Sequence, residues 1–224
     1  DVATSMDIEN VQCLYMLGEL ARQNGDLERS ERAFRALLLI ARRRTAEEGS
    51  VGTSEVLYEL HQIAKARGDL DQAGELLESA LEAATQSEAE SQRLRSRLSN
   101  HGEFQLLLRA LEMRLQAAND AHSQAVVLAE VAQVLDSAFG RSDEAFDRWL
   151  QAIRLIPESA TFHESALRLA RRRRRLNEYV QALRELATHM RRRQDSDLVA
   201  SLLLRAGQVT ETELSDLDAA SEFY

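Results

Sequence analysis

The chain has 224 residues, of which 44% are hydrophobic, and a formal net charge of −9 at pH 7. Its apolar runs are far shorter than the roughly 20 residues that cross a bilayer, so the sequence predicts no membrane span. Its one cysteine, Cys13, excludes an internal disulfide and fits a reducing compartment. The sequence shows no signal-peptide pattern, and we expect a cytoplasmic protein. Because the chain starts at Asp1 and stops within a predicted helix, we also expect a fragment of a longer protein.

Composition indicates an all-α fold. Alanine, leucine, glutamate, arginine and glutamine dominate the sequence, and these side chains lose little freedom in a helix. There are one proline and nine glycines to interrupt helices. No short stretch alternates apolar and polar residues between turn signals, as a half-buried strand does.

The first predicted elements follow one pattern that occurs twice. Residues 14–27 read LYMLGELARQNGDL and residues 57–70 read LYELHQIAKARGDL, so seven residues match at equal offsets. Gly25 and Gly68 can adopt the left-handed conformation that ends a helix. The aspartate after each glycine can accept hydrogen bonds from the first N–H groups of the next helix. Each segment therefore predicts a helix, a tight turn and a second, antiparallel amphipathic helix.

This unit resembles the tetratricopeptide repeat, a helix pair of about 34 residues with small and bulky residues at set positions. The resemblance is clear in the first, second and fourth units and more diffuse elsewhere. It implies an all-α superhelix, a right-handed solenoid of antiparallel helix pairs, with about six units of which the last is truncated. A looser half-a-tetratricopeptide array and a packed helical bundle are the alternatives. We expect no domain boundary, and units at residues 11–43, 54–86, 88–120, 125–158, 160–193 and 197–224.

One turn position marks each predicted unit. Four of these positions hold glycine, but the fifth and sixth units have no turn glycine. The predicted turn residues, in chain order, are Gly25, Gly68, Gly102, Gly140, Arg174 and Ser215. The only Gly/Ser/Glu-rich connection, residues 45–53, lies between the first two units.

The sequence contains no recognisable catalytic or metal-binding set. None of the five histidines has the spacing of a metal-ligand motif, and His61 stands where the repeat has a small residue, so we interpret it as a packed structural side chain. Cys13 has no nearby His or Lys that would activate its thiol as a nucleophile, and we interpret it as a small buried hydrophobe. We therefore expect no enzyme activity, no metal and no cofactor.

The resemblance also implies a binding groove, because the first helix of each tetratricopeptide unit lines the concave surface. Side chains four residues apart share one helix face. Tyr15 and Tyr58 would offer a flat apolar surface with a polar tip to a peptide, or would pack between adjacent first helices. The Lys/Asn set that grips a C-terminal carboxylate in some members is absent. The candidate groove residues are Tyr15, Glu19, Arg22, Tyr58, Gln62, Lys65, Gln92 and Ser96.

A run of five arginines is the second candidate binding site. It could contact an anionic partner such as an acidic peptide, a phosphate or an RNA backbone. The favoured interpretation is structural, because cations stabilise helix C-termini and acidic neighbours can pair with them. The net charge of −9 also argues against nucleic acid. The run consists of Arg171, Arg172, Arg173, Arg174 and Arg175.

The function predicted from these patterns is a scaffold that binds a protein or peptide in its concave groove, without catalysis. One alternative is an RNA- or polyanion-binding repeat that uses Arg171 to Arg175. Another is a regulatory or structural helical domain of a larger enzyme or sensor. The partner's identity and the oligomeric state are left open.

Overall fold

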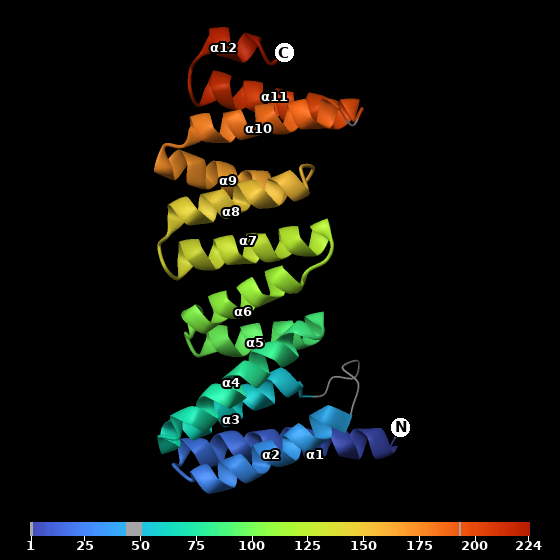
Figure 1. Cartoon of the computed structure of the whole chain (residues 1–224), viewed down its shortest axis with the longest axis vertical. Coiled ribbons are helices and arrows are strands. Elements are labelled where there is room, and N and C mark those ends of the chain that lie inside the picture. The colour runs from blue at the N-terminus through green and yellow to red at the C-terminus, as the bar shows by residue number, and fades with distance from the viewer. Residues whose placement is uncertain (1, 44–50, 193) are drawn as a thin grey trace. The chain divides into compact units, whose positions relative to one another are not determined.

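The structure, a computed structural model, describes residues 2–43, 51–192 and 194–224, and side chains from residue 11 onward within them. These ranges contain twelve helices and no strand, which confirms the all-α prediction (Figure 1). The predicted connection at residues 45–53 lies largely outside the described residues. The helices are α1 (Val2–Gln23), α2 (Leu27–Arg43), α3 (Thr53–Arg67), α4 (Leu70–Thr85), α5 (Glu88–Asn100), α6 (Phe104–Ala117), α7 (Ala121–Ser137), α8 (Ser142–Leu155), α9 (Ala160–Arg173), α10 (Leu176–Arg191), α11 (Ser196–Thr212) and α12 (Leu217–Ser221).

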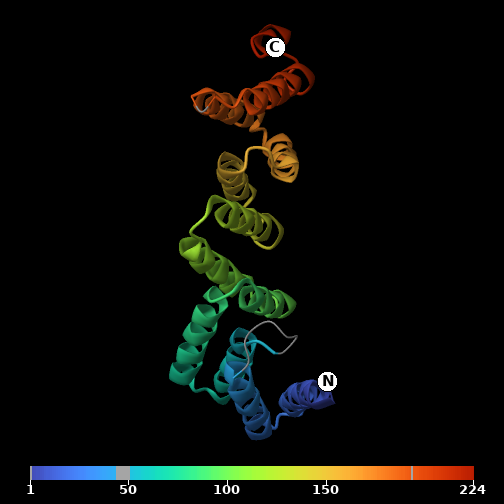
Figure 2. The ribbon, with the colours of Figure 1, turned by 90° about the vertical axis from the view of Figure 1, so that its right-hand side faces the viewer.

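The helices divide into two compact units. Unit 1 covers Asp1–Ala117 with α1–α6, and unit 2 covers Ala118–Tyr224 with α7–α12. This division was not anticipated from the sequence, and a single solenoid over the whole chain stays a prediction. Within each unit, an odd-numbered helix packs against the even-numbered helix that follows it, and each pair packs against the next (Figures 1 and 2). The described residues thus form successive antiparallel helix pairs, as a tetratricopeptide-like repeat requires.

The residues at the predicted turn positions all adopt the left-handed conformation. The four glycines have φ between 64° and 82°, while Arg174 and Ser215 have φ of 59° and 56°. At Arg174 the end of α9 forms the same hydrogen bonds as a glycine turn, since Arg175 N donates to Ala170 O at 2.8 Å. The predicted turns are therefore confirmed, including the two without glycine. A non-glycine residue in this region costs about 1–2 kcal/mol.

We expect Arg174→Gly to stabilise unit 2 by about 0.5–1 kcal/mol. The variant removes the steric cost of an arginine in the left-handed conformation, and the greater conformational freedom of glycine in the unfolded chain offsets only part of this gain. Urea unfolding followed by the fluorescence of Trp149 in α8 measures the change. Gly140→Ala, in the same unit, is the reverse control, because a Cβ at Gly140 meets nothing within 4 Å and the variant therefore reports only the backbone cost. A loss of stability in Arg174→Gly would contradict the prediction.

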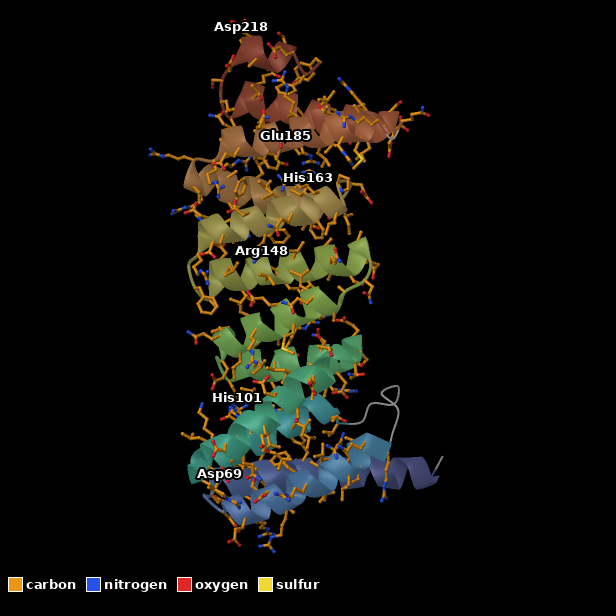
Figure 3. The ribbon with its side chains drawn as sticks, in the orientation of Figure 1. Asp69, His101, Arg148, His163, Glu185 and Asp218 are labelled. Atoms are coloured by element: carbon orange, nitrogen blue, oxygen red, sulfur yellow. The ribbon has the colours of Figure 1, made fainter. Side chains whose placement is uncertain are left out.

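Aspartates cap the helices that follow the turns at Gly25 and Gly68, as the sequence predicted. The Asp26 carboxylate accepts a hydrogen bond from Arg29 N at 3.0 Å, and the Asp69 carboxylate accepts one from Gln72 N at 3.1 Å. Asp69 is labelled in Figure 3 at the turn between α3 and α4. Each carboxylate satisfies an N–H group that has no partner within its helix.

In the first two pairs, one position of the first helix lies in close contact with the second helix. A Cβ on Gly18 of α1 would lie 2.7 Å from the Phe34 ring of α2, so only glycine fits there. In α3 the position holds His61, which is 7% exposed and whose Nδ1 donates to Ala73 O at 2.8 Å. His61 is therefore a packed structural side chain, as expected.

A carboxylate from α5 fixes the start of α3. The two oxygens of Glu90 accept hydrogen bonds from Thr53 N at 3.0 Å and Ser54 N at 2.8 Å. The Ser54 hydroxyl donates in turn to the Glu90 carbonyl at 2.9 Å. These bonds satisfy first-turn N–H groups of α3 and hold α5 in one register beside it.

Candidate functional site on the first helices of unit 1

Charged and polar side chains meet on the first helices of unit 1, which are α1, α3 and α5. They belong to a surface that we call the first-helix face. His101, at the end of α5, is labelled in Figure 3. The face consists of Tyr15, Glu19 and Arg22 from α1, Glu55, Tyr58, Glu59 and Gln62 from α3, and Arg97 and His101 from α5.

Glu59 lies at the centre of this face and has no solvent exposure. Its Oε1 accepts a hydrogen bond from the Tyr15 hydroxyl at 3.5 Å and lies 3.9 Å from His101 Nε2. Its Oε2 lies 3.9 Å from Arg22 Nε, and neither of these two buried atoms has a hydrogen bond. Burial raises the pKa of the Glu59 carboxyl, while the charge of Arg22 and then of Arg97 lowers it. A buried acid with an incomplete set of hydrogen bonds is costly for folding.

Arg97 connects the three first helices. Its guanidinium lies 3.2 Å from a carboxylate oxygen of Glu19 on α1 and 3.7 Å from one of Glu55 on α3. It also stacks 4.6 Å from the centroid of the Tyr15 ring, in cation–π geometry. Because its side chain is 25% exposed, Arg97 is accessible to a partner while it holds α5 against α1 and α3.

The structure brings some of the predicted groove residues into this face. Tyr15, Glu19 and Arg22 are half-buried and belong to the network, whereas Lys65 is exposed with its Nζ 3.7 Å from Glu103. Tyr58 is fully buried, so its ring does not offer an open surface. Burial raises the pKa of its hydroxyl to about 12. Gln62 is half-buried, and its side chain donates to the Tyr58 hydroxyl at 2.8 Å. The last two predicted residues, Gln92 and Ser96, are both exposed on α5.

Four residues of the face were not predicted from the sequence: Glu55, Glu59, Arg97 and His101. Glu55 and Glu59 are four residues apart on α3, and Arg93 and Arg97 are four residues apart on α5. Complementary charges at this spacing on consecutive first helices are the signal that could have found three of them. No sequence signal indicated His101.

The predicted arginine run is paired within unit 2. Arg171 lies 2.6 Å from Glu213, and Arg172 pairs with Asp136. Arg173 lies 2.5 Å from Asp143. Among the described side chains, each of these cations thus has a carboxylate partner from another helix or its flanking turn, which agrees with the structural interpretation.

Arg175 makes the most contacts of this run. Its Nη2 lies 2.8 Å from Asp147 and 2.6 Å from Glu178, and its guanidinium lies 4.5 Å from the centroid of the Phe146 ring. Its Nη1 also donates to Asp143 O at 3.1 Å. Arg175 thus holds the start of α10 against α8.

We expect Arg175→Gln to destabilise unit 2 by about 1–2 kcal/mol, since it removes a cation–π contact and a partly buried ion-pair network. Arg174→Gln is the matched control, because it removes the charge of the neighbouring, exposed arginine and leaves a non-glycine residue in the left-handed conformation. Urea unfolding followed by Trp149 fluorescence measures both. Equal stabilities of the two variants would contradict the structural role of Arg175.

One single-residue interpretation from the sequence is wrong, and one histidine that was not interpreted individually is buried. Cys13 is exposed, so the expectation that it is a buried hydrophobe is wrong, because it lies on the side of α1 away from the contact with α2. His163 is 1% exposed, and its Nε2 and Nδ1 lie 2.8 Å from Pro157 O and the Tyr179 hydroxyl (Figure 3). His163 is therefore a hydrogen-bonded core residue of unit 2.

The described residues contain no group of three or more His, Cys, Asp and Glu side chains that could hold a metal ion. In the same ranges, no helix combines the length and apolar character that a bilayer crossing requires. The first-helix face itself shows hydrogen bonds, ion pairs and one cation–π contact.

Comparison with known proteins gives structural likeness only. No protein-family model matches the chain, and no curated protein does. One similar solved structure is MamA, residues 41 to the end, from Desulfovibrio magneticus RS-1, with 19% identity and a TM-score of 0.39 over 84% of this chain and 98% of that one. Another is a tetratricopeptide repeat protein from Parabacteroides merdae ATCC 43184, with 15% identity and a TM-score of 0.39 over 96% of this chain and 77% of that one. Sequence identities and TM-scores this low support no conclusion about function.

Proposed function

We propose that this chain is a protein-binding scaffold, without catalysis, and that the first-helix face of unit 1 binds a segment of a partner protein. The observation that carries the proposal is the buried Glu59, whose Oε2 has no hydrogen bond, beside the equally unsatisfied Nε of Arg22. A helix pair needs only an apolar contact at this place, and a buried charge is often no better for stability than a hydrophobic side chain. Charged groups retained at such a cost commonly serve recognition.

The exposed parts of the face indicate how a partner would be held. The side chains of Glu19, Arg22 and Arg97 are between a quarter and a third exposed and offer both signs of charge. Gln62, which donates to the Tyr58 hydroxyl, and Ser96, the exposed neighbour of Arg97 in the sequence, add hydrogen-bonding groups. Tyr15, half-buried under Arg97, supplies the aromatic contact that is common at interface centres. This mixture favours a polar peptide with charges of both signs over a polyanion.

The arginine run is not part of the proposed site. Carboxylates pair with Arg171, Arg172, Arg173 and Arg175, so binding to a nucleic acid would have to break several ion pairs. We propose that this run has a structural role. Arg174 is its one member that shows no ion pair among the described residues, and one cation gives little affinity for a nucleic acid backbone.

Selection of peptides from a displayed random library, followed by calorimetric titration, tests the proposal. We expect Gln62→Arg and Gln62→Trp to weaken the binding of the selected peptides at least tenfold, since a long cation or a large ring would lie across the face. Glu112→Arg, an exposed change on the second helix α6, is the control. Binding that survives both face variants, or salt-sensitive binding of RNA in preference to any peptide, would overturn the proposal.

A further inference from the structure

Unit 1 has a pocket whose lining residues do not belong to the first-helix face, although both surfaces use α3. A pocket of about 220 Å³ lies between α2, α3 and α4. Leu60 and Ile63 of α3, both almost fully buried, form its floor together with Ala64. Leu38 of α2 and Leu76 of α4 form the walls, so the interior is apolar.

The size of this pocket decides what can fill it. Sites for drug-sized ligands begin near 300 Å³ and are mostly larger. A pocket of about 220 Å³ is therefore small for a cofactor but suits one large side chain. Insertion of one apolar anchor into such a pocket is the usual centre of a protein–protein contact. Leu39, one helical turn after Arg35, is 61% exposed and extends the apolar surface beyond the pocket.

The charges at the mouth determine which partner fits. The carboxylate of Glu31 pairs with two guanidinium groups, that of Arg35 at 2.6 Å and that of Arg67. Two cations share one anion, so the mouth carries an excess of one positive charge. The Arg35 side chain is 61% exposed, whereas Glu31 is 17% exposed, and an approaching molecule therefore meets the cations first. A partner carboxylate beside the pocket would be attracted, and a cation would be repelled.

We propose that this pocket docks a protein partner that inserts one aliphatic side chain, of the size of leucine or methionine, and places a carboxylate against Arg35 and Arg67. The pocket uses α2, α4 and those residues of α3 that are not part of the first-helix face, so this contact can form while that face is occupied. The chain would then hold two polypeptide segments on separate surfaces of unit 1. This inference does not depend on the first-helix face being a binding site.

Peptides selected from a displayed random library on the whole chain, with the first-helix face blocked by Gln62→Arg, test the proposal. We expect the enriched sequences to share an aliphatic residue next to an acidic one. We expect Arg35→Glu and Gln72→Trp, which invert the charge of the mouth and cover it, to weaken their binding at least tenfold. Arg32→Glu is the matched control and should leave binding within about twofold, since Arg32 is 77% exposed and does not line the pocket.

Circular dichroism checks whether each variant is folded. If Gln72→Trp does not fold, Arg35→Glu alone tests the proposal. Failure to enrich any aliphatic–acidic sequence would overturn the proposal. Equal weakening by Arg35→Glu and Arg32→Glu would also overturn it, because the effect would then be a general one of charge. Neither result bears on the first-helix face, which is tested by its own variants.

Discussion

Replacement of Arg97 by alanine is expected to lower the free energy of unfolding of unit 1 by about 2–3 kcal/mol. The variant removes the cation that joins Glu19 and Glu55, the stacking on Tyr15 and one of the positive charges near buried Glu59. Removing one partner of a fully buried ion pair costs about 3–5 kcal/mol. We expect less here because the Arg97 side chain is 25% exposed and water can reach the carboxylates that it leaves.

Arg109→Ala is the matched control for this experiment. Arg109 of α6 also makes an ion pair across helices, 2.7 Å from Glu78, but both side chains are about half exposed. An exposed pair contributes about 0–1 kcal/mol, so the control should lose far less than Arg97→Ala. Urea unfolding of the whole chain, followed by amide hydrogen exchange in α3, measures both. Similar losses in the two variants would show that Arg97 does not organise the face.

Unit 2 is expected to lose stability as the pH falls below about 6.5, because His163 must be neutral in the folded state. Pro157 O can only accept, so Nε2 of His163 carries the proton and Nδ1 accepts from the Tyr179 hydroxyl. Burial lowers the pKa of His163, the carbonyl of Pro157 opposes this shift, and the charge of Arg205 adds to it. Below the unfolded pKa the unfolded chain binds the extra proton, so stability falls by up to about 1.4 kcal/mol per pH unit until the folded pKa is reached.

Urea unfolding at about pH 7.5 and pH 5, followed by Trp149 fluorescence, measures this loss. Trp149 is 3% exposed and packs against Phe162, so it reports the unfolding of unit 2. We expect the loss to be smaller in His163→Gln, whose side chain does not titrate, and unchanged in His122→Gln, an exposed control. An equal loss of stability in wild type and His163→Gln would assign the pH dependence to other groups.

Local signals made the fold predictable. The left-handed turns and their capping aspartates depend on a few consecutive residues, so Gly25, Asp26, Gly68 and Asp69 could be read directly. Even Arg174 and Ser215 were placed by repeat position, although their residue types do not favour positive φ. The two compact units could not be foreseen, because their separation depends on packing between helices rather than on any local signal.

The candidate site was only partly predictable, because its chemistry depends on contacts between residues far apart in the chain. Tyr58 became a buried residue since the His101 ring of α5 packs against it, at 5.6 Å between ring centroids. Arg97 reaches Glu19 of α1, a residue two helix pairs away in the sequence. Position in a helix indicates which side chains share a face, but not which of them an adjacent helix will cover.

Site-specific photo-crosslinking gives the most direct test of whether the first-helix face binds a partner segment. A benzophenone label on the cysteine of Ser96→Cys, with exposed Cys13 first changed by Cys13→Ser, places the reactive group beside Arg97. The same label in Glu112→Cys lies on the second helix α6. If the face is the binding site, a peptide selected on the unmodified chain will crosslink at position 96 and not at position 112. Crosslinking at position 112 alone, or equally at both positions, would contradict it.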